Sequence, residues 1–279
     1  MTRTRIAYMP LATYPQAVAD PSIEAAAAFV ASLDCTLHVT TFAVHIPQVS
    51  SALGNLLVDV PRIAREAEEK SRAECRRLEG LVQGVTGSHR DVQCSAREVV
   101  LSAVLDAAAA EARYYDFAVL PWSGETVAAR EMTQSVVFGS GRPAILVPPS
   151  ARPVPLDRIA IAWDGGRVAA RALGDALPFL ADGGSISVLT VRGEKPLREP
   201  DLAGALVSAL VKRGLNATPL ETTLGKRSIA DALQETALSN GAQLLAMGGF
   251  GHSRIRDFVL GGATKGILTQ LRLPVLLSH

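Results

Sequence analysis

The chain of 279 residues is long enough for two domains of ordinary size, at about 150 residues per domain. Hydrophobic residues make up 48% of the chain but aromatic residues only 5%, so the core must be aliphatic, as in helices packed on a sheet. The formal net charge of +1 provides no basic surface for nucleic acid and no acidic tail, and any partner must therefore be recognised by a local site.

No segment has the apolar length of a membrane span or of a signal peptide, so we expect a protein without membrane contact. The cysteines are Cys35, Cys75 and Cys94, an odd number without C-x-x-C spacing, which argues against a disulfide framework and against a zinc site. These features favour a reducing compartment and predict a cytoplasmic protein.

The first half of the chain alternates short apolar segments with helical patterns, which predict strands and helices in turn. We expect strands at 5–9, 36–44, 91–98, 116–120 and 144–148. We expect helices at 23–33, 61–82 and 101–113, with a fourth within 121–141.

The second half repeats this order after a proline-rich stretch at 148–157, which cannot continue a strand ladder and predicts an extended linker. We expect strands at 158–164, 185–191, 218–223, 243–247 and 274–278. We expect helices at 167–180, 201–212, 228–238 with Ser228 as N-cap, and 263–271.

The two halves match most closely at their ends. YYDFAVLPWSG before PAILVPP parallels GAQLLAMGGFG before PVLLSH, each being a strand, a turn with glycine, a helix and a proline that opens the last strand. Strands that alternate with helices predict a parallel sheet covered on both faces. The sequence therefore predicts a duplication, with one α/β domain at 1–150 and a second at 151–279.

The stretch MGGFGHSRIRDFVLGGATKG, residues 247–266, contains glycines at two turns whose spacing permits phosphate binding. Gly248 and Gly251 follow a predicted strand, where residues without Cβ allow positive φ and close approach of a ligand. Gly261 and Gly262 precede a predicted helix, whose N–H groups and dipole favour an anion. These positions are consistent with a phosphate loop, and equally with a tight crossover between strand and helix.

The run G-G-F-G, nine residues, then G-G, a helix and PVLL closely resembles the ATP-binding signature of the universal stress protein family, which is G-x-x-G, nine residues, G and then Ser or Thr. The resemblance covers essentially the whole chain as a tandem pair of such domains and is most specific over 243–278. It implies two flavodoxin-like, Rossmann-type domains, each an open parallel five-stranded sheet with helices on both faces, and a site for ATP with or without Mg²⁺.

The resemblance also implies which residues contact the nucleotide. Adenine and ribose contacts would fall on Ala162, Trp163, Asp164, Val191, Met247 and Gly248, and phosphate contacts on Gly251, Gly261, Gly262 and Ala263. Asp164 has a second interpretation, as a turn residue in WDGG.

Two departures from the family pattern affect this expectation. Gly262 stands where the family has a hydroxyl residue, and the loss of a hydrogen bond to a charged group costs about 1.5–3 kcal/mol. In the first half Pro121 replaces the first glycine, and its first strand, which we end before Pro10, is not followed by an aspartate. We therefore expect ATP binding in the second half only.

The resemblance predicts a stress-response regulatory protein that binds an adenine nucleotide. The sequence has no serine-hydrolase or zinc-protease motif and no convincing acid–base pair, so we assign no catalytic and no metal-binding residue. Two alternatives stay open, a slow metal-dependent ATP hydrolase and an interaction scaffold that binds no nucleotide. In the family, domains pair through their last strands, so we expect AILVP and PVLLS to pair within the chain, and homodimers of whole chains are a further expectation.

Overall fold

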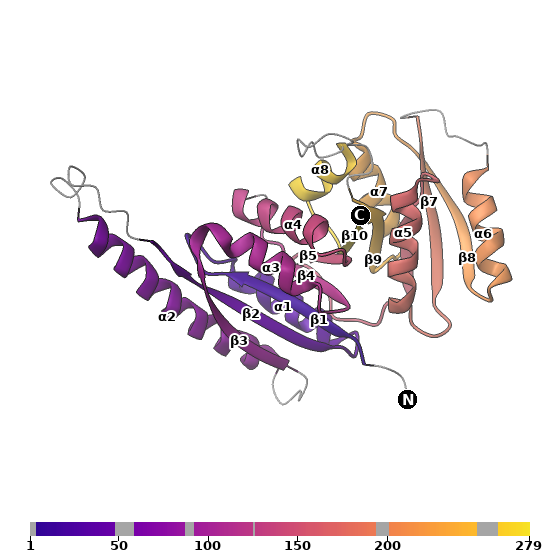
Figure 1. Ribbon diagram of the computed structural model, residues 1–279. Coiled ribbons are helices and arrows are strands. Elements are labelled where there is room, and N and C mark those ends of the chain that lie inside the picture. The colour runs from indigo at the N-terminus through magenta and orange to yellow at the C-terminus, as the bar shows by residue number, and fades with distance from the viewer. Residues whose placement is uncertain (1–3, 48–58, 87–91, 125, 194–200, 250–261) are drawn as a thin grey trace.

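The computed structural model describes residues 4–47, 59–86, 92–124, 126–193, 201–249 and 262–279. One ten-stranded sheet runs through both halves of the chain, in the order β3-β2-β1-β4-β5-β10-β9-β6-β7-β8 (Figure 1). The strands are β1 (Ile6–Ala12), β2 (Thr36–His45), β3 (Val92–Val100), β4 (Phe117–Pro121), β5 (Ala144–Val147), β6 (Arg158–Ala162), β7 (Ser185–Arg192), β8 (Asn216–Thr223), β9 (Leu244–Gly248) and β10 (Val275–Ser278).

Helices connect the strands in both halves. They are α1 (Asp20–Ala31), α2 (Val60–Thr86), α3 (Val104–Ala112), α4 (Val127–Gly139), α5 (Arg167–Ala176), α6 (Leu202–Lys212), α7 (Ile229–Ser239) and α8 (Gly262–Thr269), with short 3₁₀ helices at Leu101–Ala103 and Leu177–Phe179. Side chains cap several helix starts: the Ser228 hydroxyl accepts a hydrogen bond from the Asp231 N–H at 3.1 Å, and Thr126 caps α4 in the same way. The N-cap predicted at Ser228 is confirmed.

The two halves repeat the same strand order about the centre of the sheet. Within each half all pairs are parallel, and the halves meet where β10 pairs antiparallel with β5, Val275 opposite Leu146 and Leu277 opposite Ala144. The expected pairing of the two last strands within the chain is therefore confirmed. It joins the two five-stranded sheets into one and leaves neither of these strands as an open edge.

The strand predicted to end before Pro10 is longer than expected. β1 continues to Ala12 because its pairing with β2 runs without a break from Ile6 opposite Thr36 to Ala12 opposite Phe42. On its other side β1 pairs with β4 only at Ala7 and Tyr8, so the missing N–H of Pro10 removes no ladder bond there. The expected first-strand boundary was wrong for this reason.

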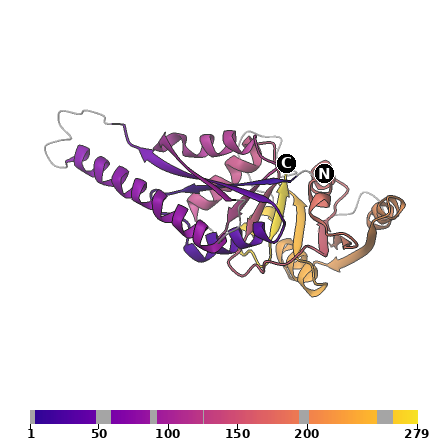
Figure 2. The ribbon, with the colours of Figure 1, turned by 90° about the horizontal axis from the view of Figure 1, so that it is seen from below.

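Helices cover both faces of the sheet, as Figure 2 shows for the view from below. One apolar layer contains buried residues of α1, α2, α5 and α6, including Phe29, Leu78, Leu173 and Leu210. The other contains buried residues of α3, α4, α7 and α8, among them Ala108, Val136, Leu233 and Ile267. Each layer therefore includes residues of both halves.

The stretch 148–157 contains no helix and no strand, as expected for a linker. The division of the chain into domains 1–150 and 151–279 stays a prediction, because both apolar layers cross it. Among the described residues, no helix combines the length and the apolar character that crossing a membrane requires. The three cysteines are free thiols, and burial raises the pKa of each.

Candidate functional site

The strand order of the C-terminal half reverses between β6 and β9. From β6 the chain proceeds outward to β7 and β8, then returns to the other side of β6 to form β9 and β10. In open parallel sheets, ligands bind beyond the carboxyl ends of the strands at such a reversal. Six predicted site residues lie at or just after these ends. β6 ends at Ala162, two residues earlier than expected, so Trp163 and Asp164 follow it; Val191 lies on β7, and Met247 and Gly248 lie on β9.

The backbone register brings these strand ends together. Ala162 lies opposite Leu189 of β7, and Ile161 lies opposite Ala246 of β9. The N–H of Trp163 donates a hydrogen bond of 2.8 Å to the carbonyl of Leu189, which extends the β6–β7 contact by one residue. The three strands therefore present their predicted contacts at one edge of the sheet.

Trp163 is half-buried and packs against the apolar layer that contains α5 and α6. Its indole N–H is buried and has no hydrogen-bond partner within the described part of the chain. An unpaired buried donor costs free energy, so a ligand that offers an acceptor here would remove that cost.

Asp164 is exposed and has a structural role. Its Oδ1 accepts a hydrogen bond of 2.7 Å from the N–H of Gly166, the N-cap residue of α5, and Gly165 between them has a φ of +72°. The interpretation of Asp164 as a turn residue is therefore correct. A nucleotide contact at this exposed carboxylate stays a prediction.

Gly248 also has a structural reason to lack a side chain. A Cβ at this position would lie 2.5 Å from Cγ2 and 2.8 Å from the carbonyl carbon of Val168, near the start of α5. Its φ is not positive, contrary to the expectation from sequence. The glycine is needed because the end of β9 and the first turn of α5 pass very close to each other.

The next residue, Gly249, donates a hydrogen bond of 2.7 Å from its N–H to the carbonyl of Ser278 at the end of β10. Trp122 makes the equivalent contact in the N-terminal half, with its N–H 2.9 Å from the carbonyl of Val147 at the end of β5. The N-terminal half thus has Pro121 and a buried tryptophan where the C-terminal half has two glycines. The absence of an ATP site in the N-terminal half stays a prediction, and these residues favour it.

The second part of the motif begins α8. Because β9 and β10 are parallel neighbours, the helix that connects them starts at the carboxyl edge, where the other predicted contacts lie. Gly262 is exposed, and a Cβ built on it would meet no atom of the described residues within 4 Å; Ala263 follows it and is half-buried. Two predicted contacts, Gly251 and Gly261, lie outside the described residues.

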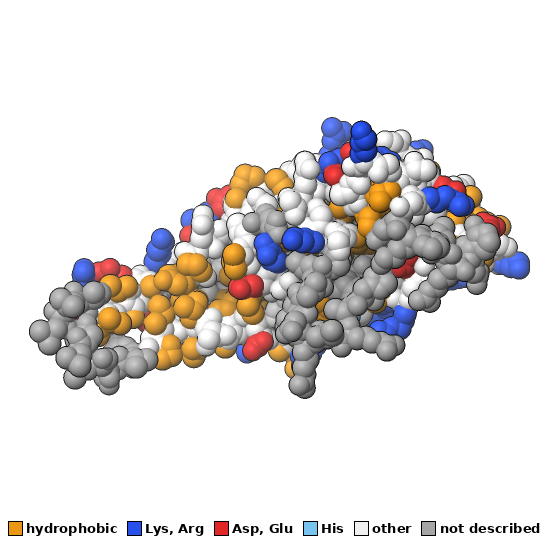
Figure 3. Space-filling view, turned by 90° about the horizontal axis from the view of Figure 1, so that it is seen from above, with side chains coloured by type: hydrophobic (Ala, Val, Ile, Leu, Met, Phe, Trp, Pro, Cys, Tyr) orange, Lys and Arg blue, Asp and Glu red, His pale blue; other side chains and the backbone are white. Residues whose placement is uncertain are grey.

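Basic residues stand near the same edge. Arg167 begins α5, Arg192 ends β7 and Lys226 precedes α7, and all three are exposed. Figure 3 views the molecule from above and shows Lys and Arg side chains at several places on this face. Arg192 is bound to Glu221 at 2.7 Å, so its charge is partly compensated. Positive charge at this edge favours an anionic ligand.

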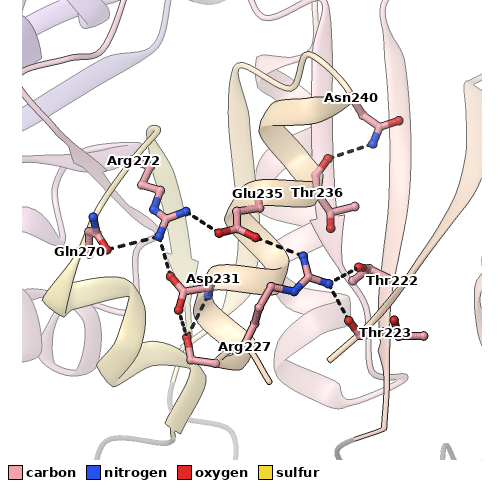
Figure 4. Close-up of polar contacts among 10 residues, drawn as sticks. Thr222, Thr223, Arg227, Asp231, Glu235, Thr236, Asn240, Gln270 and Arg272 are labelled. Carbon is pink, nitrogen blue, oxygen red and sulfur yellow. Dashed lines mark hydrogen bonds and ion pairs between the residues drawn. The ribbon is translucent and has the colours of Figure 1, made fainter. Parts of the chain in front are cut away.

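Sequence reasoning missed one polar network beside this edge. Arg227, just before α7, donates to the Thr223 carbonyl at 2.6 Å and pairs with Glu235 of α7 at 3.1 Å (Figure 4). Arg272 bonds Glu235 and Asp231 from the segment before β10, at 3.0 and 2.7 Å. The spacing of Asp231 and Glu235 on one helix face was the only sequence signal, and it did not indicate the partners.

No group of three or more His, Cys, Asp or Glu side chains that could hold a metal ion occurs in the ranges that the structure describes.

A protein-family model, described as the universal stress protein family, matches residues 155–279. The C-terminal half is a universal stress protein domain. This domain contains the whole strand reversal and every predicted contact residue. A search of curated protein sequences found no match.

Solved structures extend the likeness to the full chain. A universal stress protein from Archaeoglobus fulgidus DSM 4304 shares 14% sequence identity, with a TM-score of 0.66 over 97% of each chain. A functionally unknown protein from Pseudomonas aeruginosa PAO1 is also 14% identical, with a TM-score of 0.52 over 97% of this chain and 92% of that one. A universal stress protein in complex with cAMP, 19% identical, covers 44% of this chain and 96% of its own, with a TM-score of 0.31.

The two full-length structural matches confirm the predicted fold, two flavodoxin-like halves in tandem within one chain. The universal stress protein family model covers the C-terminal half.

Proposed function

We propose that this protein is a cytoplasmic stress-response regulator that binds an adenine nucleotide at a single site in its C-terminal half. The observation that carries the proposal is the meeting of the ends of β6, β7 and β9 at the strand reversal, within a universal stress protein domain that retains the glycine motif. The nucleotide that we propose is ATP, with Mg²⁺ as the companion of its phosphates.

The proposed contacts divide by chemistry. The adenine and ribose would lie against Ala162, Trp163, Asp164, Val191, Met247 and Gly248, with the indole N–H of Trp163 as an available donor. The phosphates would meet the backbone at Gly251, Gly261, Gly262 and Ala263, because the first N–H groups of a helix have no partner within the helix and the start of α8 is the positive end of its dipole.

Binding is a better proposal than catalysis. Hydrolysis needs a positioned water and compensation of the developing charge. Asp164, the acidic residue at the strand reversal, already uses one carboxylate oxygen to hold the start of α5. A slow metal-dependent ATP hydrolase and a scaffold without a nucleotide are therefore outcomes of the tests below.

The first test asks whether purified protein retains an adenine nucleotide, by mass spectrometry after denaturation. Nucleotide-free protein is then titrated with ATP and AMP by calorimetry, with and without Mg²⁺. We expect saturable binding with one site per chain. If neither nucleotide binds, the result would support the alternative of an interaction scaffold without a nucleotide. Mg²⁺-dependent release of phosphate would support the alternative of an ATP hydrolase.

Gly262 allows a sharper test of where the phosphates lie. Because a Cβ there meets no described atom within 4 Å, Gly262→Ser should restore the family's hydroxyl group and tighten ATP binding by about 10- to 100-fold, which corresponds to about 1.5–3 kcal/mol. Gly262→Asp should weaken ATP binding through charge repulsion, while the melting temperature stays equal or rises because an acidic residue suits a helix start.

Gly262→Asn is the neutral control of nearly the same size and should bind ATP like the wild type. If the Asp and Asn variants bind ATP equally well, the phosphates do not lie at the start of α8.

A further inference from the structure

The beginning of the glycine motif is held by the last two residues of the chain. Gly249 donates its N–H to the Ser278 carbonyl at 2.7 Å, and its own carbonyl lies 3.2 Å from Nδ1 of His279. Both backbone groups of Gly249 are therefore bound at the C-terminal end of β10. Gly249 directly follows Gly248, one of the proposed nucleotide contacts.

Residues of α4, in the N-terminal half, lie next to both His279 and Gly249. The His279 ring contacts Phe138 of α4 edge to face, with 4.7 Å between ring centroids and 76° between planes. A Cβ built on Gly249 would lie 3.7 Å from Cγ1 of Val137, the neighbouring residue of α4. A continuous set of contacts therefore runs from α4 through His279 to the backbone beside the site.

The chemistry of the contact fixes the direction of the hydrogen bond. A carbonyl oxygen only accepts, so Nδ1 of His279 must carry the proton, as it does in one neutral tautomer and in the imidazolium. The aromatic contact with Phe138 restricts the plane of the ring, and the donor is then directed at the Gly249 carbonyl. Without Phe138, the exposed His279 side chain would have other rotamers available.

We propose that Phe138 and His279 are positioning residues. Through them, the N-terminal half fixes the position of the backbone at Gly248 and Gly249, and this position determines the affinity of the nucleotide site. This inference rests on the proposed function. The half without the glycine motif thereby contributes to binding in the other half, by keeping the strand end in the competent arrangement before the ligand arrives.

Calorimetry with ATP on the full chain tests the proposal. His279→Ala and Phe138→Ala should each weaken ATP binding by about 3- to 10-fold, the range of one lost hydrogen bond. His279→Asn should restore most of the affinity, because the asparagine amide N–H₂ can reach the position of Nδ1. The double variant should lose less than the sum of the single effects, since both residues act on one contact.

Phe179→Leu is the matched control. Phe179, in the 3₁₀ helix after α5, makes another edge-to-face contact between the halves, with Phe117 of β4 at 4.9 Å and 87°. It lies at the opposite, amino edge of the sheet, because α5 starts at the carboxyl edge. This variant should lower the melting temperature and leave ATP affinity unchanged.

The outcomes separate the two hypotheses. Wild-type protein that binds no adenine nucleotide would overturn the proposed function and this inference with it. Wild-type binding that His279→Ala and Phe138→Ala leave unchanged, or that Phe179→Leu weakens as much as they do, would overturn this inference alone.

Discussion

Gly248 illustrates how one residue can satisfy a binding motif and a packing requirement together. Gly248→Ala should lower the free energy of unfolding by about 1–3 kcal/mol, because the new methyl group would overlap Val168, including its backbone carbonyl carbon at 2.8 Å. Urea denaturation of the ligand-free protein measures this effect.

Gly174 in α5 provides the matched control for that substitution. A Cβ there meets no atom within 4 Å in the part of the chain that the structure describes, so Gly174→Ala should raise stability by about 0.5–1 kcal/mol through helix propensity. If Gly248→Ala proves as stable as the wild type but binds ATP poorly, the glycine serves the ligand and packing does not require it.

The sequence predicted where the site residues lie but not what each contacts. The family resemblance implied Ala162, Trp163, Met247 and Gly248 as nucleotide contacts, and the strand order places all four at one edge of the sheet. The hydrogen bond from Gly166 to Asp164 and the approach of Val168 to Gly248 depend on the packing of α5, which no local pattern encodes.

At the scale of elements, two arginines bind the acidic side chains of α7: Arg272 from the segment before β10, and Arg227 from the segment before α7. Arg272 and Arg227 both bind Glu235, and Arg272 also binds Asp231, which in turn accepts a hydrogen bond from the N-cap Ser228 (Figure 4). Glu235 thus lies between two guanidinium groups. Hydrogen bonds from Arg272 and then Arg227 lower the pKa of its carboxyl group.

This pKa shift predicts a pH-dependent contribution to stability. The folded-state pKa of Glu235 is below the unfolded-state value of about 4.3, so the stabilisation is present above that value and is lost as pH falls through the folded pKa. Glu235→Gln should therefore have a lower urea midpoint than the wild type at pH 7, and the two midpoints should converge in acid.

Glu131→Gln, at an exposed position of α4 with no ion pair in the described chain, is the control and should change the midpoint little at any pH. A difference between wild type and Glu235→Gln that persists unchanged to pH 3 would show that the ion pairs are not its cause.

Every predicted helix and strand exists, because periodic apolar patterns and caps are local signals. The errors lie at boundaries. The strand expected to end before Pro10 continues, and the single helix expected over 167–180 gives way to a 3₁₀ helix at Leu177–Phe179, which contains Pro178. The extension of β1 depends on its pairing with β2, which the local sequence does not provide. The end of α5 agrees with the local effect of Pro178, since a proline ends or kinks a helix at the preceding residue.

At the scale of the whole molecule, the halves share their cores. The antiparallel pairing of β5 and β10 is at the centre of the sheet, and each apolar layer continues across it. Arg5 lies over the Phe179 ring at 4.5 Å, and Arg171 donates to the Gly141 carbonyl at 3.3 Å, so polar contacts also join the halves. The proposed division at residue 150 therefore separates two repeats that stabilise each other.

Separate expression of 1–150 and 151–279 tests this dependence. Each fragment alone would expose a fully buried last strand, so we expect it to melt well below the full chain or to self-associate through that strand. Mixed fragments should form a one-to-one complex whose melting temperature approaches that of the full chain, as measured by light scattering and thermal denaturation.

The 151–279 fragment should also bind ATP more weakly than the complex, because it lacks Phe138. A monomeric 151–279 fragment with the melting temperature and ATP affinity of the full chain would contradict the shared core and the positioning role of α4 together.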